Sequence, residues 1–162
     1  MKFLTLGLLL LVINANAQSD KYCKKIKKEI DDFTGEVKFS SPYTIAQYPE
    51  LVRAVKIVEN DTANYYIGLN AYGRTSSVGE KGVIILMDDG SKIEFPDAEI
   101  DIDVYSADIY RYSCFVALNA DHLKKLSEST INKYRLYIYD KEIKRKYKIK
   151  YQEYFKCIQV AE

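Results

Sequence analysis

GVIILMDDGSKIEF, residues 82–95, is the stretch that decides the fold. Two runs of strand-forming residues, Gly82–Met87 and Ser91–Phe95, flank Asp88-Asp89-Gly90. Asp-Gly suits the positive backbone angles of a type I′ turn, so the stretch predicts a β-hairpin. A strongly marked hairpin in the middle of the chain indicates an antiparallel sheet.

Strand patterns continue on both sides of this hairpin. Asn60 and Asp61 tolerate tight turns, and the apolar-rich runs around them predict a second hairpin. Residues 21–32 fit a strand face and a helix face equally well, and we assign them to a strand. The other expected strands of the chain are Val37–Phe39, Arg53–Glu59, Asn64–Ala71, Glu99–Tyr105, Tyr110–Leu118 and Ile131–Tyr139.

Two short helices are expected in the last third of the chain. Asn119 is a suitable N-cap for a helix over Ala120–Ser127, because its side chain can accept a first-turn N–H. The apolar residues that begin at Tyr151 recur at helical spacing and predict a second helix. The expected fold class is therefore α+β, a mostly antiparallel β-sheet in a sandwich or half-barrel, with two short helices.

The first seventeen residues have the pattern of a cleavable secretory signal peptide. Lys2 supplies the charge, Phe3–Ile13 is the apolar stretch, and Ala15-Asn16-Ala17 is the small-residue cleavage site. We expect cleavage after Ala17, which leaves a single β-rich domain over residues 18–162. The mature chain is expected in the periplasm or outside the cell, without a transmembrane anchor.

Composition limits the classes of partner. Loss of Lys2 with the signal leaves basic and acidic residues equal in number, at 23 each, so net charge identifies no partner. Nucleic acid is not expected for an exported protein. Fifteen Tyr and no Trp favour pleated strands, where a ring packs and its hydroxyl stays wet. A Tyr-lined sugar groove is the functional alternative.

Three cysteines would meet an oxidising compartment, which favours one disulfide and one remaining thiol. The sequence alone does not specify the pair. Cys114 lies in the apolar run Tyr112–Leu118, where a small buried hydrophobic residue is expected. The pair left is Cys23 with Cys157, which would tie the start of the mature domain to its end.

A basic run near the C-terminus is the candidate contact for anionic surfaces such as glycans or lipid head groups. Its candidate residues are Lys144, Arg145, Lys146 and Lys148. The alternative, which we favour, is an edge strand whose lysines discourage unwanted pairing with other strands.

An acidic run, Asp97, Glu99, Asp101 and Asp103, alternates with apolar residues. In a strand all four carboxylates would share one face, which suggests calcium as a ligand. Side chains two apart on a strand stand nearly parallel, whereas calcium needs converging oxygens. We therefore expect a solvated strand face and assign no metal site.

No catalytic constellation is recognised. His122 is the single histidine, so a Cys/His zinc set cannot be assembled, and we expect this residue to be exposed. A Cys114–His122 dyad is disfavoured because Cys114 lies in an apolar strand. There is no Gly-x-Ser-x-Gly elbow and no phosphate-binding glycine loop. The sequence therefore predicts no catalytic residue and no cofactor.

Three segments carry a resemblance to known proteins: Asp32-Phe33-Thr34-Gly35, Gly82–Ile93 and Ile131–Asp140. Through them the chain resembles small uncharacterised exported proteins of Bacteroidota. The resemblance spans most of the mature chain and implies export. It implies no activity and no catalytic residue.

The sequence favours an exported, non-enzymatic binding or envelope-associated module, whose partner is a glycan, an envelope component or a protein. The alternative is a small secreted hydrolase using carboxylates. A deep pocket with convergent polar groups and perturbed acids would indicate the enzyme. A shallow Tyr-lined face would indicate binding.

Overall fold

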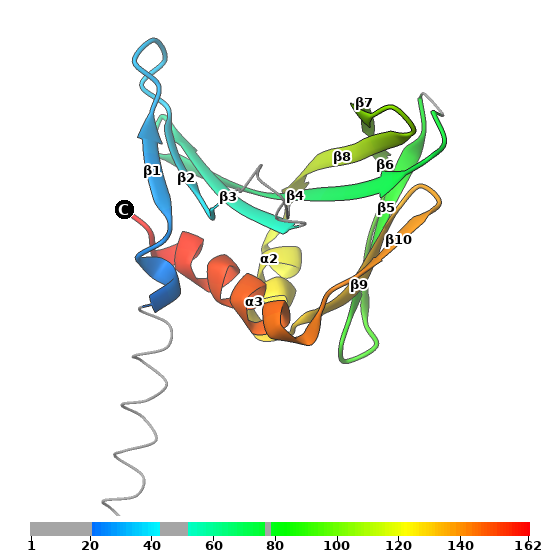
Figure 1. The fold of residues 1–162 in the computed structure, drawn as a ribbon. Coiled ribbons are helices and arrows are strands. Elements are labelled where there is room, and N and C mark those ends of the chain that lie inside the picture. The colour runs from blue at the N-terminus through cyan, green and yellow to red at the C-terminus, as the bar shows by residue number, and fades with distance from the viewer. Residues whose placement is uncertain (1–20, 43–51, 77–78) are drawn as a thin grey trace, which may run out of the picture.

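The computed structural model describes residues 21–42, 52–76 and 79–162. The predicted signal peptide lies outside these residues. The described chain is mostly antiparallel β-sheet with a few short helices, so the predicted α+β class is confirmed (Figure 1). None of its helices is long and apolar enough to cross a membrane.

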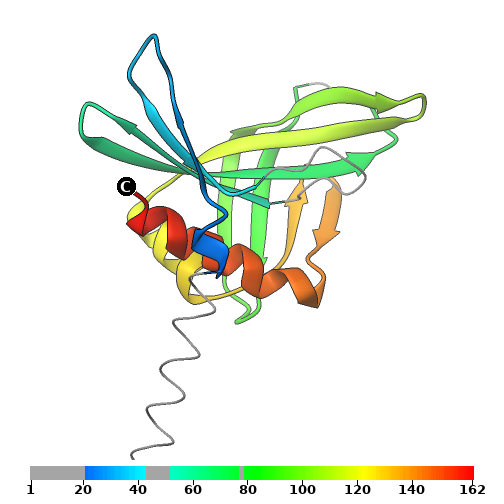
Figure 2. The ribbon, with the colours of Figure 1, turned by 60° about the vertical axis from the view of Figure 1, so that its left-hand side comes forward.

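The described strands form two antiparallel sheets that run at a steep angle to one another (Figure 2). The six-stranded sheet has the order β1-β2-β3-β4-β8-β7. Its strands are β1 (Lys27–Ile30), β2 (Val37–Ser40), β3 (Val52–Glu59), β4 (Thr62–Gly73), β8 (Ile109–Leu118) and β7 (Asp101–Ser106). The four-stranded sheet has the order β10-β9-β5-β6. Its strands are β10 (Tyr139–Glu142), β9 (Ile131–Leu136), β5 (Lys81–Met87) and β6 (Lys92–Glu99).

Both hairpins expected from turn residues are present. Asn60 and Asp61, between β3 and β4, both take positive φ, at 49° and 61°. The positive backbone angles expected at Asp89-Gly90 are found only at Gly90, with φ 83°. The Gly90 N–H instead donates to the Met87 carbonyl at 3.1 Å, so the predicted type I′ turn is wrong. A three-residue loop with one left-handed glycine replaces it.

The strand predicted over Ile131–Tyr139 is a hairpin in the structure. β9 ends at Leu136, Tyr137 takes a φ of 54°, and β10 returns antiparallel to β9. A bulky residue with positive φ is rare, and no glycine or Asn-Gly pair marks this turn. The turn therefore leaves no local signal in the sequence.

The helix after Asn119 is confirmed. α2 (Ala120–Glu128) begins where the Asn119 side chain accepts a hydrogen bond from the His122 backbone N–H at 2.8 Å. The last helix, α3 (Arg145–Val160), begins six residues before the predicted apolar pattern at Tyr151. The favoured edge-strand interpretation of the basic run is therefore wrong, because Arg145, Lys146 and Lys148 lie in the first turns of α3 and Lys144 is its N-cap.

The N-terminal prediction is only partly right. Residues 21–23 are helical, and the strand expected over residues 21–32 is limited to β1. Tyr22 packs edge-on against Tyr154 of α3, with ring centroids 5.9 Å apart. This contact favours a helical turn at the start of the described chain.

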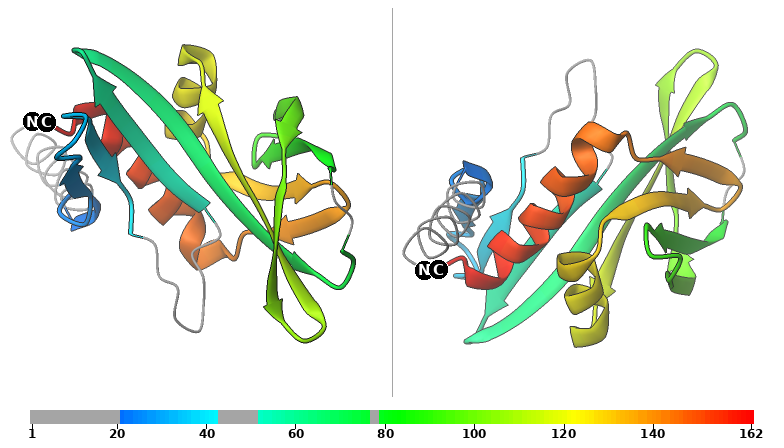
Figure 3. Two further views of the ribbon diagram at one scale, coloured as in Figure 1. Left: turned by 90° about the horizontal axis from the view of Figure 1, so that it is seen from above. Right: turned by 90° about the horizontal axis from the view of Figure 1, so that it is seen from below.

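A single hydrophobic core lies between the two sheets and the helices. β4 contributes Ile67 and Leu69, β5 contributes Ile85, and α3 contributes Phe155, each at most 1% exposed. Figure 3 shows α3 lying along one side of the six-stranded sheet, under β3. The opposite side of that sheet, and the side of the four-stranded sheet turned away from the core, are called outer faces below.

The disulfide joins Cys23 to Cys157, the pair that remained when Cys114 was assigned to the core. The bridge spans 134 residues and fixes the N-terminal turn to α3. Cys114 is a free thiol and is buried. The disulfide therefore links the two ends of the described chain covalently.

A close contact joins the two sheets at Tyr139 of β10. An added Cβ on Gly73 of β4 would overlap the outer end of the Tyr139 ring, so any other residue there requires the ring to move. The Tyr139 hydroxyl accepts a hydrogen bond from the Thr75 N–H at 3.1 Å. The ring centroids of Tyr139 and Tyr112 are 4.6 Å apart. We call this contact the seam.

Candidate functional site

Aromatic side chains gather on the outer face of the six-stranded sheet. Along β4 the core residues alternate with Tyr66 and Tyr72, which point outward. Tyr66 stacks on Phe115 of β8 at 4.8 Å, and Tyr72 meets Tyr105 of β7 edge-on at 4.9 Å. We call these four residues the aromatic face.

Two of the four rings of the aromatic face are exposed to solvent, and Tyr66 and Tyr72 are half-buried. Phe115 is 53% exposed and Tyr105 is 52% exposed, although each is large enough to be a core residue. Gly68 lies opposite Phe115 in the strand register, and a Cβ added there would lie 3.7 Å from the Phe115 ring. A Cβ at this position would therefore make ordinary contact with the ring, which lies beside Gly68.

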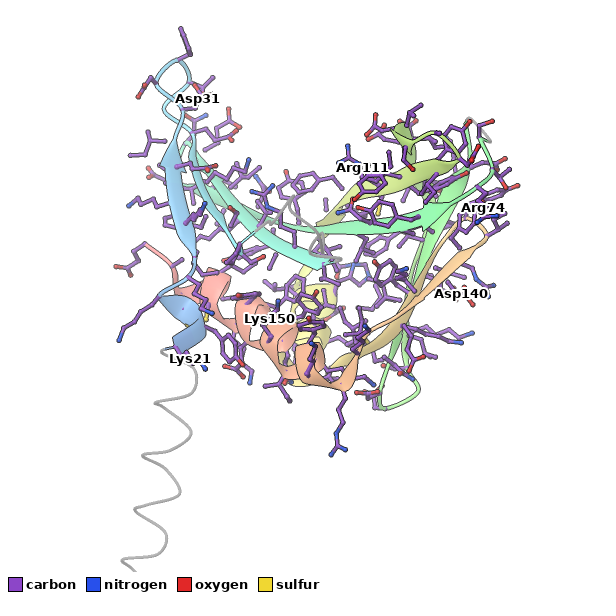
Figure 4. All side chains as sticks on the ribbon, in the orientation of Figure 1. Lys21, Asp31, Arg74, Arg111, Asp140 and Lys150 are labelled. Carbon is purple, nitrogen blue, oxygen red and sulfur yellow. A yellow bond between two sulfur atoms is a disulfide. The ribbon has the colours of Figure 1, made fainter. Side chains whose placement is uncertain are left out.

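Charged groups lie beside the rings on this face. Arg111 is opposite Tyr72 in the β4–β8 register, and its guanidinium donates to the Asp103 carboxylate at 2.5 Å. Figure 4 shows Arg111 on the side of the sheet away from α3. Farther along, Arg53 donates to the Ser40 hydroxyl at 3.0 Å. The face therefore combines apolar rings with hydrogen-bonding groups.

The outer face of the four-stranded sheet is different. It has two adjoining depressions of about 300 and 240 Å³, both lined by Ile84 and Arg135. Arg135 forms a two-point ion pair with Asp140, which includes a contact of 2.9 Å from Nη2. These hydrogen bonds lower the pKa of Asp140. The depressions are shallow, and their other carboxylate is that of Glu94.

The lowered carboxyl pKa values do not suit acid catalysis. Lys148 and Thr130 lower the pKa of Asp88 by hydrogen bonding to it, and backbone N–H groups lower that of Asp31. The pKa of Asp89 is lowered by Ser91. A general acid at neutral pH needs a raised carboxyl pKa. These three aspartates and Asp140 are therefore ionised at neutral pH.

The four candidate residues for anionic surfaces divide into two groups. Lys144, Arg145 and Lys146 are exposed at the start of α3. Lys148 is turned inward, where its ammonium donates to Asp88 at 2.5 Å and to the Asn132 side chain at 3.0 Å. Lys148 therefore fastens α3 to the β5–β6 turn, whereas the other three remain accessible.

The acidic run is split between the two sheets. β6 ends at Glu99, β7 begins at Asp101, and Ile100 between them is buried. Glu99 lies 3.9 Å from Lys81, and Asp103 pairs with Arg111. Within the described ranges, no three His, Cys, Asp or Glu side chains are grouped to hold a metal ion.

The Cys114 thiol is unsuited to nucleophilic chemistry, because burial raises its pKa to about 12. His122, expected to be exposed, is half-buried, with its ring edge-on to Phe95 at 4.9 Å. Desolvation lowers the pKa of His122, so its ring is neutral at neutral pH.

The sequence predicted strand aromatics but not which of them would meet. Tyr66 and Phe115 are far apart in the chain, and only the antiparallel register of β4 and β8 brings them together. Alternation along Asn64–Ala71 was a usable signal for the outward position of Tyr66. Comparisons with protein-family models, curated proteins and solved structures found no match to the chain.

Proposed function

We propose that this protein is an exported, non-enzymatic binding module whose ligand lies across the aromatic face. The observation that carries the proposal is the exposure of Phe115 and Tyr105 on one sheet face. Large aromatic side chains that stay half exposed contribute little to the core, whereas aromatic residues are enriched where proteins bind ligands.

The proposed ligand is a glycan chain. A sugar ring offers an apolar C–H face and a rim of hydroxyl groups, and the aromatic face offers rings beside an arginine and a carboxylate. Tyr66 and Tyr72 are six residues apart on β4, or about 20 Å at the rise of a strand. That length suits an extended chain of several sugar units, touching both aromatic pairs.

Export is part of the proposal. Its support is the small-residue cleavage site at Ala15-Asn16-Ala17 together with a disulfide that suits an oxidising compartment. The naturally produced protein is expected to have an intact mass that starts at Gln18. A mass that retained Met1 would contradict export by this route.

The binding test uses calorimetry with a panel of neutral and acidic polysaccharides of defined composition. For a polysaccharide that binds, Phe115→Ala and Tyr105→Ala are each expected to weaken binding about tenfold, since 1.4 kcal/mol corresponds to a factor of ten. The matched control is Ile84→Ala, a 36% exposed apolar residue on the outer face of the other sheet.

Equal affinity in the aromatic variants and the wild type would contradict the proposed face. Failure of the wild type to bind any polysaccharide would contradict the proposed glycan ligand. Circular dichroism of each variant establishes that the fold is retained, which we expect because the altered side chains lie outside the core.

A further inference from the structure

The loop at the tip of the β1–β2 hairpin is fixed by its own hydrogen bonds. The Asp31 carboxylate accepts from the backbone N–H groups of Phe33 at 2.8 Å and Thr34 at 3.0 Å. The Gly35 N–H donates to the Asp31 carbonyl at 2.8 Å. The loop therefore has a defined conformation that needs no contact with the rest of the domain.

This loop presents an apolar knob. Phe33 is 100% exposed, and the neighbouring Ile30 is 60% exposed. Figure 1 shows the hairpin projecting from the domain, with its tip directed away from α3. A pre-organised aromatic side chain that buries no surface in its own fold is typical of an anchor residue at an interface. We call Phe33 and Ile30 the knob.

The charge of the loop that carries the knob is negative. Asp31, Asp32 and Glu36 lie beside it, and no basic residue occurs between Ile30 and Val37. Hydrogen bonds from the loop amides lower the pKa of Asp31, which keeps that carboxylate ionised. A complementary surface therefore needs an apolar spot with cations around it, and an anionic membrane is disfavoured.

The same chain carries such a surface on α3. Ile149 is 45% exposed, and Arg145 and Lys146 precede it by four and three residues, on the same helix face. Both cations are exposed. They lie in the first turn of α3, where the helix dipole adds partial positive charge. We call these three residues the basic patch.

We propose that a second copy of this chain is the partner of the knob, with Phe33 of one copy seated on Ile149 of the next, between Arg145 and Lys146. The knob and the basic patch are different surfaces, so the contact is heterologous and continues from copy to copy instead of closing into a dimer. It is separate from the aromatic face and does not depend on the proposed function.

Sedimentation equilibrium of the mature protein tests this proposal. The weight-average mass is expected to rise continuously with protein concentration and to fall as salt is added, since the exposed charges are screened. Phe33→Ser is expected to remove the association without loss of fold, because this side chain contacts no core residue. Val160→Ser, at a 74% exposed apolar residue at the other end of α3, is the matched control.

Charge-reversal variants distinguish this contact from nonspecific association. Arg145→Glu with Lys146→Glu is expected to abolish self-association, and so is Asp32→Lys with Glu36→Lys. A mixture of these two variants is expected to associate again, because the original knob of the first meets the original patch of the second, and the reversed knob meets the reversed patch. A monomeric wild type at every concentration, association that survives Phe33→Ser, or a mixture that stays monomeric would each overturn the proposal.

Discussion

The two sheets share one core but differ on their outer faces. The six-stranded sheet exposes the rings of Tyr105 and Phe115, with an arginine and a carboxylate beside them. The four-stranded sheet exposes Ile84 beside the Arg135–Asp140 ion pair, over two shallow depressions. The need to bury a core explains the apolar residues on the inner faces of both sheets. It does not require aromatic rings on an outer face, which is why we place function there.

The two sheets also differ in how they are fastened to α3. The disulfide holds the N-terminal turn that leads into β1, at the edge of the six-stranded sheet. The β5–β6 turn of the four-stranded sheet is held by the ion pair of Asp88 with Lys148, which is partly exposed to solvent. A covalent tie over a long loop stabilises far more than a partly exposed ion pair. Loss of the disulfide is therefore expected to release the edge of the six-stranded sheet, whereas protonation of Asp88 at low pH is expected to release the β5–β6 turn.

Among the substitutions that test this difference, removal of the disulfide is expected to have the largest effect on stability. Cys23→Ser with Cys157→Ser should lower the free energy of unfolding by about 4 to 5 kcal/mol, because the bridge closes a long loop in the unfolded chain. Urea unfolding measures the loss, and hydrogen exchange should show β1 and β2 opening before β5 and β9.

Cys114→Ala is the control for the cysteine variants, since it removes a buried thiol but no bridge. It should cost only about 1 kcal/mol, the scale of one small buried group. Unchanged stability in the double serine variant would show that the bridge does not hold the sheet edge.

A substitution at the seam is expected to have an intermediate effect. Gly73→Ala places a Cβ within the Tyr139 ring and should cost about 1 to 3 kcal/mol, as overpacking does. Gly68→Ala on the same strand is the control, because its Cβ would have ordinary contacts of 3.4 Å or more.

Thermal unfolding compares the two glycine variants. The combined variant Gly73→Ala with Tyr139→Ala should show a smaller loss than the sum of the single variants, because one substitution removes the other's clash. Strictly additive losses would argue against contact between the two sheets at this point.

The smallest effect is expected at the ion pair of Asp88 with Lys148. The folded-state pKa of Asp88 lies below the ordinary aspartate value of 3.8, so the pair stabilises fully above that value and less as pH falls through the folded-state pKa. With the Asp88 side chain 37% exposed, the contribution should be about 0.5 kcal/mol.

Urea unfolding at neutral pH and at pH values below about 4 measures this term. Asp88→Asn should remove this acid loss of stability, whereas Lys148→Gln should only reduce it, because the Thr130 hydroxyl still donates to Asp88 in the second variant. A variant at either position with the acid profile of the wild type would refute this assignment.

The sequence by itself determined the elements whose signals are local. Asn60-Asp61 and the residues around Asp89-Gly90 specify hairpins because the turn chemistry lies in the turn residues themselves. Asn119 specifies the start of α2 because its side chain caps that helix. The proposed signal peptide also rests on local residues, and it stays a prediction.

Tertiary structure decided the features that depend on distant residues. The chain turns at Tyr137, between β9 and β10, although no residue there favours a turn. The packing of Leu136 and Tyr139 on either side fixes the two strands. The start of α3 resembles a strand because Tyr147 and Ile149 alternate with lysines, yet contacts with Asp88 and Asn132 hold it as a helix.

The candidate site belongs to this second class. Alternation along β4 determines that Tyr66 and Tyr72 share a face, but it does not determine which strand lies alongside. The β4–β8 and β7–β8 registers bring Phe115 and Tyr105 to them from distant parts of the chain. Strand order depends on burial of the whole core, so no local pattern specifies it, and the aromatic face exists only in the folded protein.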